Sequence, residues 1–347
     1  MEPSTFEPVE PIRRNPQRPN SIKKRHGFGS GGPNFHLALA RRPVRKPGMP
    51  LPRSIRAFRL RPGSPVAPRL RHWLGQLSAY SASLDPIRDP VEGIHQLRLV
   101  AKSLRAVIRL ADGGRPAKDL MLHDRLIGRL AARVGVSRDS QVHSELLLKL
   151  ARKEDAPVLA AVGLLIRRHA VRKSSSGAAS KVIGGLTGEA DALQRLLPAR
   201  VDPGSIGKAV WRSYRKTLGW RERAVEESVP TDFHAWRRWQ KRLEAQLRLV
   251  GVDDANDPGS LWSDLHELQE DLGTLHDVDE LADRLGAEAQ WKGIHPRIQR
   301  RLLKLLQQRQ RELRRRLVRG SRKVLGTRLR RCCRATAKAW EKAAQTP

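Results

Sequence analysis

Two short motifs occur twice in this chain, in the same order and at nearly the same separation. The segment Ile94–Arg98, with the sequence IHQLR, is echoed 139 residues later by Phe233–Arg237, with the sequence FHAWR. The segment Leu130–Gly135 is echoed 138 residues later by Leu268–Gly273. Self-similarity at a fixed separation indicates a tandem duplication. We therefore expect two similar halves, at about residues 68–200 and 201–345, related by an internal pseudo-twofold axis.

From about residue 68 onward, proline separates long stretches of helix-forming residues. Leu, Ala, Arg and Glu dominate these stretches, and none shows the sustained alternation of β-branched residues that is typical of a strand. The fold class that we expect is therefore all-α, with about 280 residues available to bury a core. The last helical stretch should be broken near Gly320. The predicted helices span residues 68–83, 91–111, 117–152, 156–173, 178–197, 205–226, 231–250, 259–288 and 296–344.

The first 67 residues differ in composition from the rest of the chain. They hold 12 of the 23 prolines, and 14 Lys or Arg against 3 acids. Proline restricts the backbone and removes a hydrogen-bond donor, and almost no apolar periodicity is present. We expect residues 1–67 to form a disordered, Pro/Arg-rich basic tail ahead of a helical domain at 68–345. Such a tail is either a solvated linker or an anion-binding arm.

The net charge of the chain is +33, from 68 Lys and Arg against 35 Asp and Glu. Small domains usually carry a net charge of about 2–8, so this excess predicts a polyanionic partner. Cys332 and Cys333 are neighbours and cannot form a disulfide framework. No run of about 18 apolar residues is present, so we expect no membrane-spanning helix. Met1–Glu10 lacks the pattern of a signal peptide, and we expect a cytoplasmic protein.

One face of the helix predicted at 91–111 carries a ladder of cations. Its members lie at offsets 0, 3, 7, 10 and 14, which places them within a wedge of about 80° over about 21 Å. Like charges three or four residues apart repel each other on a helix. The arrangement therefore favours an anionic ligand along this face over a merely solvated basic surface. The ladder consists of His95, Arg98, Lys102, Arg105 and Arg109.

The second copy keeps only part of this ladder. Offset 10 is Glu244 instead of a cation, and we expect Arg242 to compensate from the flank. The first half should therefore contribute more of the ligand contacts. Offsets 0, 3, 7 and 14 are retained as His234, Arg237, Lys241 and Arg248.

Further basic residues accompany the repeat. Arg138 and His276 each follow the Gly of the second motif by three residues, and each precedes an Asp that either orients a neighbouring cation or forms a salt bridge between helices. A His beside an Asp could indicate a metal site, but helix neighbours point about 100° apart and Arg138 cannot bind a metal. We expect no metal site. A third set precedes the second His motif and comprises Arg212, Arg215 and Lys216.

A fourth basic set lies near the end of the chain. These residues surround their helix at all angles, so we interpret them as a solvated or nonspecific basic face. They are Arg311, Arg314, Arg315, Arg316 and Arg319.

The paired motifs resemble the CHAD family, the conserved histidine α-helical domain. The family pattern is a helix with a His, an Arg three residues on, a basic residue seven on and an Arg ten on, followed by a Leu-Gly-x-x-Arg/His-Asp element, and the whole occurs twice. The resemblance covers roughly residues 68–345. It implies two four-helix bundles about a pseudo-twofold axis, with a basic groove or pore between them. The chain departs from the pattern at Ser103, Gly128 and Glu244.

The resemblance also implies binding of inorganic polyphosphate, and some family members associate with polyphosphate granules. A linear polymer with a charge on each phosphate suits a ladder of cations, because Arg forks bind phosphate oxygens and Lys adds point charges. We therefore expect a noncatalytic polyphosphate-binding protein, associated with polyphosphate granules in the cytoplasm. The residues expected to bind polyphosphate are His95, Arg98, Lys102, Arg105, Arg109, Arg138, Arg212, Arg215, Lys216, His234, Arg237, Lys241, Arg242 and His276.

Two other functions compete with this prediction. A nonspecific nucleic-acid-binding protein would also explain the charge, but aromatic residues make up only 4% of the chain and no stacking platform is evident. A phosphohydrolase needs metal ligands or an acid–base pair that faces the phosphates. The ladders present almost only cations, so we expect neither an enzyme nor a cofactor.

Overall fold

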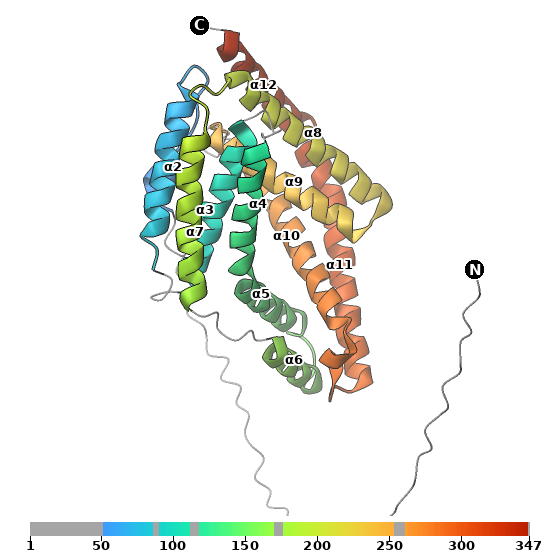
Figure 1. Ribbon diagram of the computed structural model, residues 1–347. Helices are drawn as coiled ribbons and strands as arrows, with labels where there is room; N and C mark the ends of the chain where they lie inside the picture. Colours follow the sequence, from blue (N-terminus) through green and yellow to red (C-terminus); the bar gives the residue numbers. More distant parts are fainter. Residues whose placement is uncertain (1–50, 86–89, 112–117, 170–175, 253–260, 346–347) are drawn as a thin grey trace, which may run out of the picture. The chain divides into compact units, whose positions relative to one another are not determined.

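The computed structural model describes residues 51–85, 90–111, 118–169, 176–252 and 261–345. Helices account for nearly all of these residues, and no strand occurs among them (Figure 1). The predicted all-α fold class is confirmed. None of the helices in these ranges is both long enough and apolar enough to cross a membrane.

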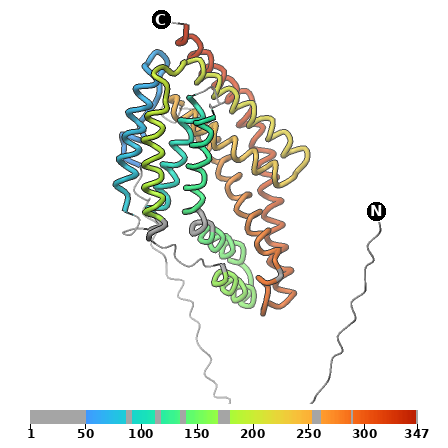
Figure 2. The backbone as a smooth tube through the Cα atoms, viewed as in Figure 1, coloured from blue at the N-terminus to red at the C-terminus, as the bar shows by residue number. Residues whose placement is uncertain are grey.

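Four helices from the first part of the chain pack against one another. Leu70, Leu74 and Leu77 of α2 (Val66–Ala82) are completely buried, and their spacing forms one apolar stripe on that helix. Burying each such side chain stabilises the fold by about 1.5–3 kcal/mol. Gly185 permits a close approach of two helices, because a Cβ atom there would lie 2.8 Å from Cδ2 of Leu130. The group consists of α2 (Val66–Ala82), α3 (Pro90–Ala111), α4 (Lys118–Arg133) and α7 (Ser176–Leu196). Although α2 and α7 are distant in the sequence, they lie side by side (Figure 2).

The helices of the second part form another packed group. Asp202 accepts a hydrogen bond of 2.9 Å from the Gly204 amide at the start of its first helix, and a proline follows at the first helical position. Gly207 lets this helix approach the last one, because a Cβ atom there would lie 2.7 Å from the Ala337 carbonyl oxygen. The group consists of α8 (Pro203–Glu227), α9 (Pro230–Leu249), α10 (Leu261–Leu285), α11 (Pro296–Leu325) and α12 (Thr327–Gln345).

Two shorter helices connect the groups. The helices α5 (Gly135–Leu150) and α6 (Ala156–His169) pack on each other, with α5 also against α10 and α6 against α11 and the 3-10 turn η1 (Glu288–Trp291). The single helix predicted at 117–152 is therefore wrong. The chain turns at Val134, whose side chain is buried in the core, and this turn directs α5 toward α10.

The predicted break near Gly320 is also misplaced. Gly320 lies inside α11, and the break occurs at Gly326, between α11 and α12. Buried Leu317, Ser321 and Val324 keep the last turns of α11 against the core beyond Gly320. At Gly326, a Cβ atom would lie 2.7 Å from the Arg322 carbonyl oxygen, so this turn requires glycine.

The packed body begins earlier than predicted. Residues 51–67, which composition assigned to the tail, include α1 (Arg53–Arg56) and bury Ile55 and Leu60. The Leu60 amide donates to the Leu249 carbonyl at 2.7 Å, and Phe58 stacks on Trp73 with ring centroids 4.7 Å apart. Three apolar side chains thus anchor a segment whose composition is otherwise that of a tail. The remaining predicted tail, residues 1–50, lies outside the described residues, and the pseudo-twofold relation between two four-helix bundles stays a prediction.

Candidate functional site

The two predicted ladders belong to helices that pack against each other. The first lies on α3 and the second on α9, and α3 contacts α9 directly. The charges of Arg98 and Lys102 on α3 both act on Lys241 of α9, while Arg237 on α9 acts on Lys102. The cations of both ladders therefore share one electrostatic environment. This shared environment is the candidate functional site.

Lys241 shows how much positive charge is concentrated there. Burial lowers its pKa, and the neighbouring charges of Arg237, Lys102 and Arg98 lower it further, to about 7. Asp277 opposes this shift only in part. An amine with this pKa is only partly protonated near neutral pH. The free protein thus keeps a cluster of cations together against their mutual repulsion.

Lys102 lies at the same end of the cluster. Its side chain is accessible to solvent, yet protein surrounds it closely enough for burial to lower its pKa. Glu244 raises this pKa, and Arg248 and Arg237 lower it. Glu244, which departs from the ladder pattern, is buried and lies 3.7 Å from Arg248. Glu244 therefore supplies a negative charge at the edge of the cluster of cations.

Three cations at this end have no counter-ion at contact distance. Within the described residues, neither an ion pair nor a side-chain hydrogen bond is formed by Arg98, Lys102 or Lys241. We call these three residues the uncompensated end of the site. Partly enclosed cations without a partner form a ready place for an external anion.

The other end of the ladder on α3 is compensated by a carboxylate from α4. Arg105 donates two hydrogen bonds to Asp124, of 2.9 and 3.0 Å, and Arg109 adds one of 3.3 Å. Burial disfavours the charged form of Asp124, but the hydrogen bond from Arg105 and the charges of Arg109 and Arg105 outweigh it and lower the pKa of Asp124. We call Arg105, Arg109 and Asp124 the compensated end. Asp124 on α4 thus faces the ladder of α3, which contains no acidic residue.

Two further predicted residues join the compensated end. Burial lowers the pKa of Arg242 to about 10, with contributions from Arg109, Arg212 and Arg105, while Asp124 opposes the shift. The Arg242 guanidinium also lies 4.7 Å from the ring centroid of Trp239. Arg242 on α9 and Arg212 on α8 therefore bring charge from the second half toward the ladder of the first.

The two histidines of the second half form a contact pair beside the uncompensated end. The rings of His234 and His276 meet edge to face, with centroids 4.5 Å apart. Burial lowers the pKa of His276 to about 3, and the charges of Arg237, His234 and Lys241 add to the effect. His276 is therefore neutral at neutral pH in the free protein. Burial is the main cause and the neighbouring cations add to it, and neither can be read from the local sequence.

Asp279 is a structural carboxylate that lies three residues after His276 on α10 and is not among the residues predicted for the site. It is buried, and its oxygens lie 3.4 Å from His234 Nε2 and 3.7 Å from Arg314. Gln310 donates to it at 2.8 Å. Arg314 also lies over the ring of Phe233, so the prediction that it belongs to a solvated face is wrong. Asp279 thus ties α9 and α11 to α10.

The remaining predicted residues are less closely connected to the cluster. His95 is half-buried one turn before Arg98 on α3. Arg215 and Lys216 are exposed on α8 and contribute to none of the principal pKa shifts in the cluster. The side chain of Arg138 lies outside the described residues.

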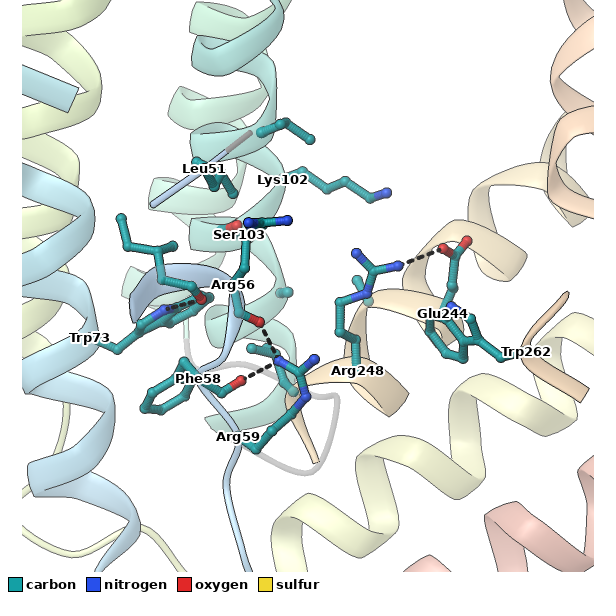
Figure 3. A pocket seen from close by; sticks show the side chains of 15 residues that line it. Leu51, Arg56, Phe58, Arg59, Trp73, Lys102, Ser103, Glu244, Arg248 and Trp262 are labelled. Atoms are coloured by element: carbon teal, nitrogen blue, oxygen red, sulfur yellow. Dashed lines mark hydrogen bonds and ion pairs between the residues drawn. The ribbon is translucent and has the colours of Figure 1, made fainter. Parts of the chain in front are cut away.

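A cavity of about 430 Å³ adjoins the uncompensated end (Figure 3). Lys102 and Arg248 project into it from α3 and α9, and Trp73 and Trp262 contribute apolar wall. The cavity therefore extends the cluster into a recess that is partly apolar. Within the described ranges, no group of three or more His, Cys, Asp or Glu side chains is arranged to hold a metal ion.

Comparison with known proteins identifies one family. The family model described as the CHAD domain matches residues 66–286. No curated protein matches the chain.

Proposed function

This protein belongs to the CHAD domain family, and from that premise we propose that it binds inorganic polyphosphate between α3 and α9 without acting on it chemically. The observation that carries the proposal is the uncompensated end. There, burial lowers the pKa of Lys241, and cations from both ladders lower it further, to about 7. A polyanion bound at this end would relieve that repulsion.

The shape of the charge favours a polymer over a small anion. The ladder on α3 extends over about 21 Å, whereas one phosphate contacts only one or two side chains. Arg98 and Arg237 can bind phosphate oxygens through two N–H groups, and Lys102 and Lys241 add point charges. A flexible polymer with a charge on each phosphate can contact all four of these side chains along its length.

The residue types at the site support a receptor rather than a catalyst. Hydrolysis of a phosphoanhydride by the protein's own side chains would need a nucleophile with a base, or an acid–base pair at the reacting phosphate. None of the three residues of the uncompensated end is a carboxylate, hydroxyl or thiol, and a pKa of about 3 makes the adjacent His276 a weak base. We extend the proposal to a noncatalytic role on polyphosphate granules.

A competition experiment tests the identity of the ligand. Labelled polyphosphate is bound to the full chain at about 150 mM salt, where nonspecific binding to phosphate backbones is weak. Unlabelled polyphosphate should displace the label, and duplex DNA, RNA and pyrophosphate should displace it poorly. If duplex DNA competes as well as polyphosphate, the protein is instead a nonspecific nucleic-acid binder.

A charge-neutralising variant tests the location. Changing Arg98, Lys102 and Lys241 to Gln should weaken polyphosphate binding by about 1,000-fold or more, at roughly 1.5 kcal/mol for each lost charged contact. The control changes three exposed cations outside α3 and α9, Lys149, Arg152 and Lys181, to Gln and removes the same number of basic residues. Equal binding by the two variants would contradict the proposed site.

A further inference from the structure

The last two helices carry a large share of the basic charge outside the candidate site. Residues 296–345 contain 18 Lys and Arg against 2 Glu, and they lie beyond the residues that the family model matches. Sequence reasoning interpreted part of this charge as a face that surrounds its helix at all angles. The structure separates it into two kinds of cation.

On α11, several cations on the flanks form ion pairs with acids of neighbouring segments. Arg301 lies 2.8 Å from Glu154, and Arg316 lies 2.9 Å from Asp271. Lys323 lies 3.7 Å from an oxygen of Asp264. These ion pairs partly compensate the charge on the flanks of α11, whereas Arg319 on the same side is exposed and forms no ion pair within the described residues.

The outward side of α11 carries a different set. By helix geometry, six cations fall within a wedge of about 60° that extends over about 37 Å, nearly opposite the buried Leu302, Leu306, Leu313 and Leu317. All six are exposed, and within the described ranges none of them forms an ion pair. We call this set the outer stripe. It consists of Arg297, Arg300, Lys304, Arg311, Arg315 and Arg322.

We propose that the outer stripe is a second binding surface for polyphosphate, so that one molecule can hold two chains and crosslink them. The inference rests on the proposed function of the candidate functional site between α3 and α9, which we call the inner site. A second, independent surface makes binding to long chains multivalent and joins separate chains without any new contact at the first site. The result would be a network of polymer and protein.

The shape of the outer stripe favours a flexible polymer over a nucleic-acid duplex. A duplex strand winds away from a straight line within about half a turn, about 17 Å, so it could follow only part of the stripe. A helix that enters the major groove contacts phosphates with both flanks. On α11, several flank cations are bound to acids such as Asp264 and Asp271. A flexible chain can follow the whole straight line.

The test compares two variants of the full chain with the same net charge. The stripe variant changes Arg300, Lys304, Arg311 and Arg315 to Gln. The control changes four exposed cations elsewhere, which are Lys149, Arg152, Lys181 and Arg195. Circular dichroism verifies that both are helical. Light scattering on titration with long polyphosphate reports crosslinking, and titration with short labelled polyphosphate reports affinity and stoichiometry.

We expect the wild type and the control to scatter strongly and to bind two short chains per molecule. The stripe variant should scatter about tenfold less light and bind only one short chain. The affinity of the inner site for that chain should stay within about twofold of the wild-type value. Scattering by the stripe variant equal to that of the control would overturn the proposal. Loss of duplex DNA binding in the stripe variant, with crosslinking by polyphosphate retained, would overturn it too. Failure of the wild type to bind short chains tightly would instead refute the inner site.

Discussion

The two ends of the inner site carry similar cations and manage their charge differently. At the compensated end, Asp124 holds Arg105 and Arg109 through three hydrogen bonds. At the uncompensated end, Lys102 and Lys241 face Arg98 and each other without a counter-ion at contact distance. The difference teaches that a ladder of cations is not uniformly available to a ligand. A carboxylate from another helix decides which cations still need an anion.

The largest predicted effect separates the two ends. Changing Lys102 and Lys241 to Gln should weaken polyphosphate binding by about 100-fold, because each loses a charge-assisted contact. Changing Arg105 to Gln together with Asp124 to Asn removes an ion pair without altering the net charge, and it should change affinity by less than about threefold. Fluorescence anisotropy measures both. If the second variant binds as weakly as the first, the compensated end is as important as the uncompensated one.

The next effect concerns pH. Lys241 has a pKa of about 7 in the free protein, and a bound polyanion should raise it, so binding takes up a proton. Affinity is then greatest below pH 7 and should fall by about tenfold between pH 6 and pH 8. Lys241→Arg keeps its charge over this range, so its affinity should vary much less with pH. An equally steep decline in that variant would place the titrating group elsewhere.

A smaller effect is expected from freeing the compensated end. Asp124→Asn leaves Arg105 and Arg109 with a neutral neighbour and should raise affinity for polyphosphate by about threefold. The same change should lower the free energy of unfolding by about 1–2 kcal/mol, because the half-buried guanidinium groups then repel each other. Anisotropy and thermal melting measure the two quantities. A stable variant with unchanged affinity would show that Asp124 does not restrain these arginines.

The smallest predicted effect concerns the melting temperature of the free protein. The folded protein lowers the pKa of Lys241 below its unfolded value, so the charged amine costs stability at pH values below about 7. Lys241→Met should therefore raise the melting temperature by about 3 °C near pH 6. The gain should shrink as pH rises from about 7 toward 10, where the wild-type amine is neutral in the fold. An increase in melting temperature that is the same near pH 6 and near pH 10 would indicate better packing rather than relief of charge.

Local patterns predicted much of the fold. Proline spacing and helix-forming composition located most helices within a few residues, as for α9, predicted at 231–250 and observed at Pro230–Leu249. The errors arose where core contacts override composition. The chain turns at Val134, whose side chain is buried in the core. Burial of Ile55 and Leu60 holds a Pro- and Arg-rich segment in the packed body.

The candidate site was predictable as a set of residues but not as an arrangement. Helical spacing identified Arg98, Lys102, Arg237 and Lys241, because three- and four-residue intervals place side chains on one face. No local signal connects Asp124 with Arg105, since the two are 19 residues apart on different helices. The lowered pKa of His276 depends likewise on tertiary structure, through burial first and through cations of α9 second.

By itself, the sequence determined that this chain is helical, strongly basic and duplicated in its His motifs, because periodicity and composition are properties of the chain. Only the tertiary structure decided which cations remain available to a ligand. That depends on distances between helices, because a charge is compensated or exposed according to what lies within a few ångströms of it. The same packing that pairs Arg105 with Asp124 leaves Lys241 crowded by cations, and it sorts α11 into paired flanks and an outer stripe.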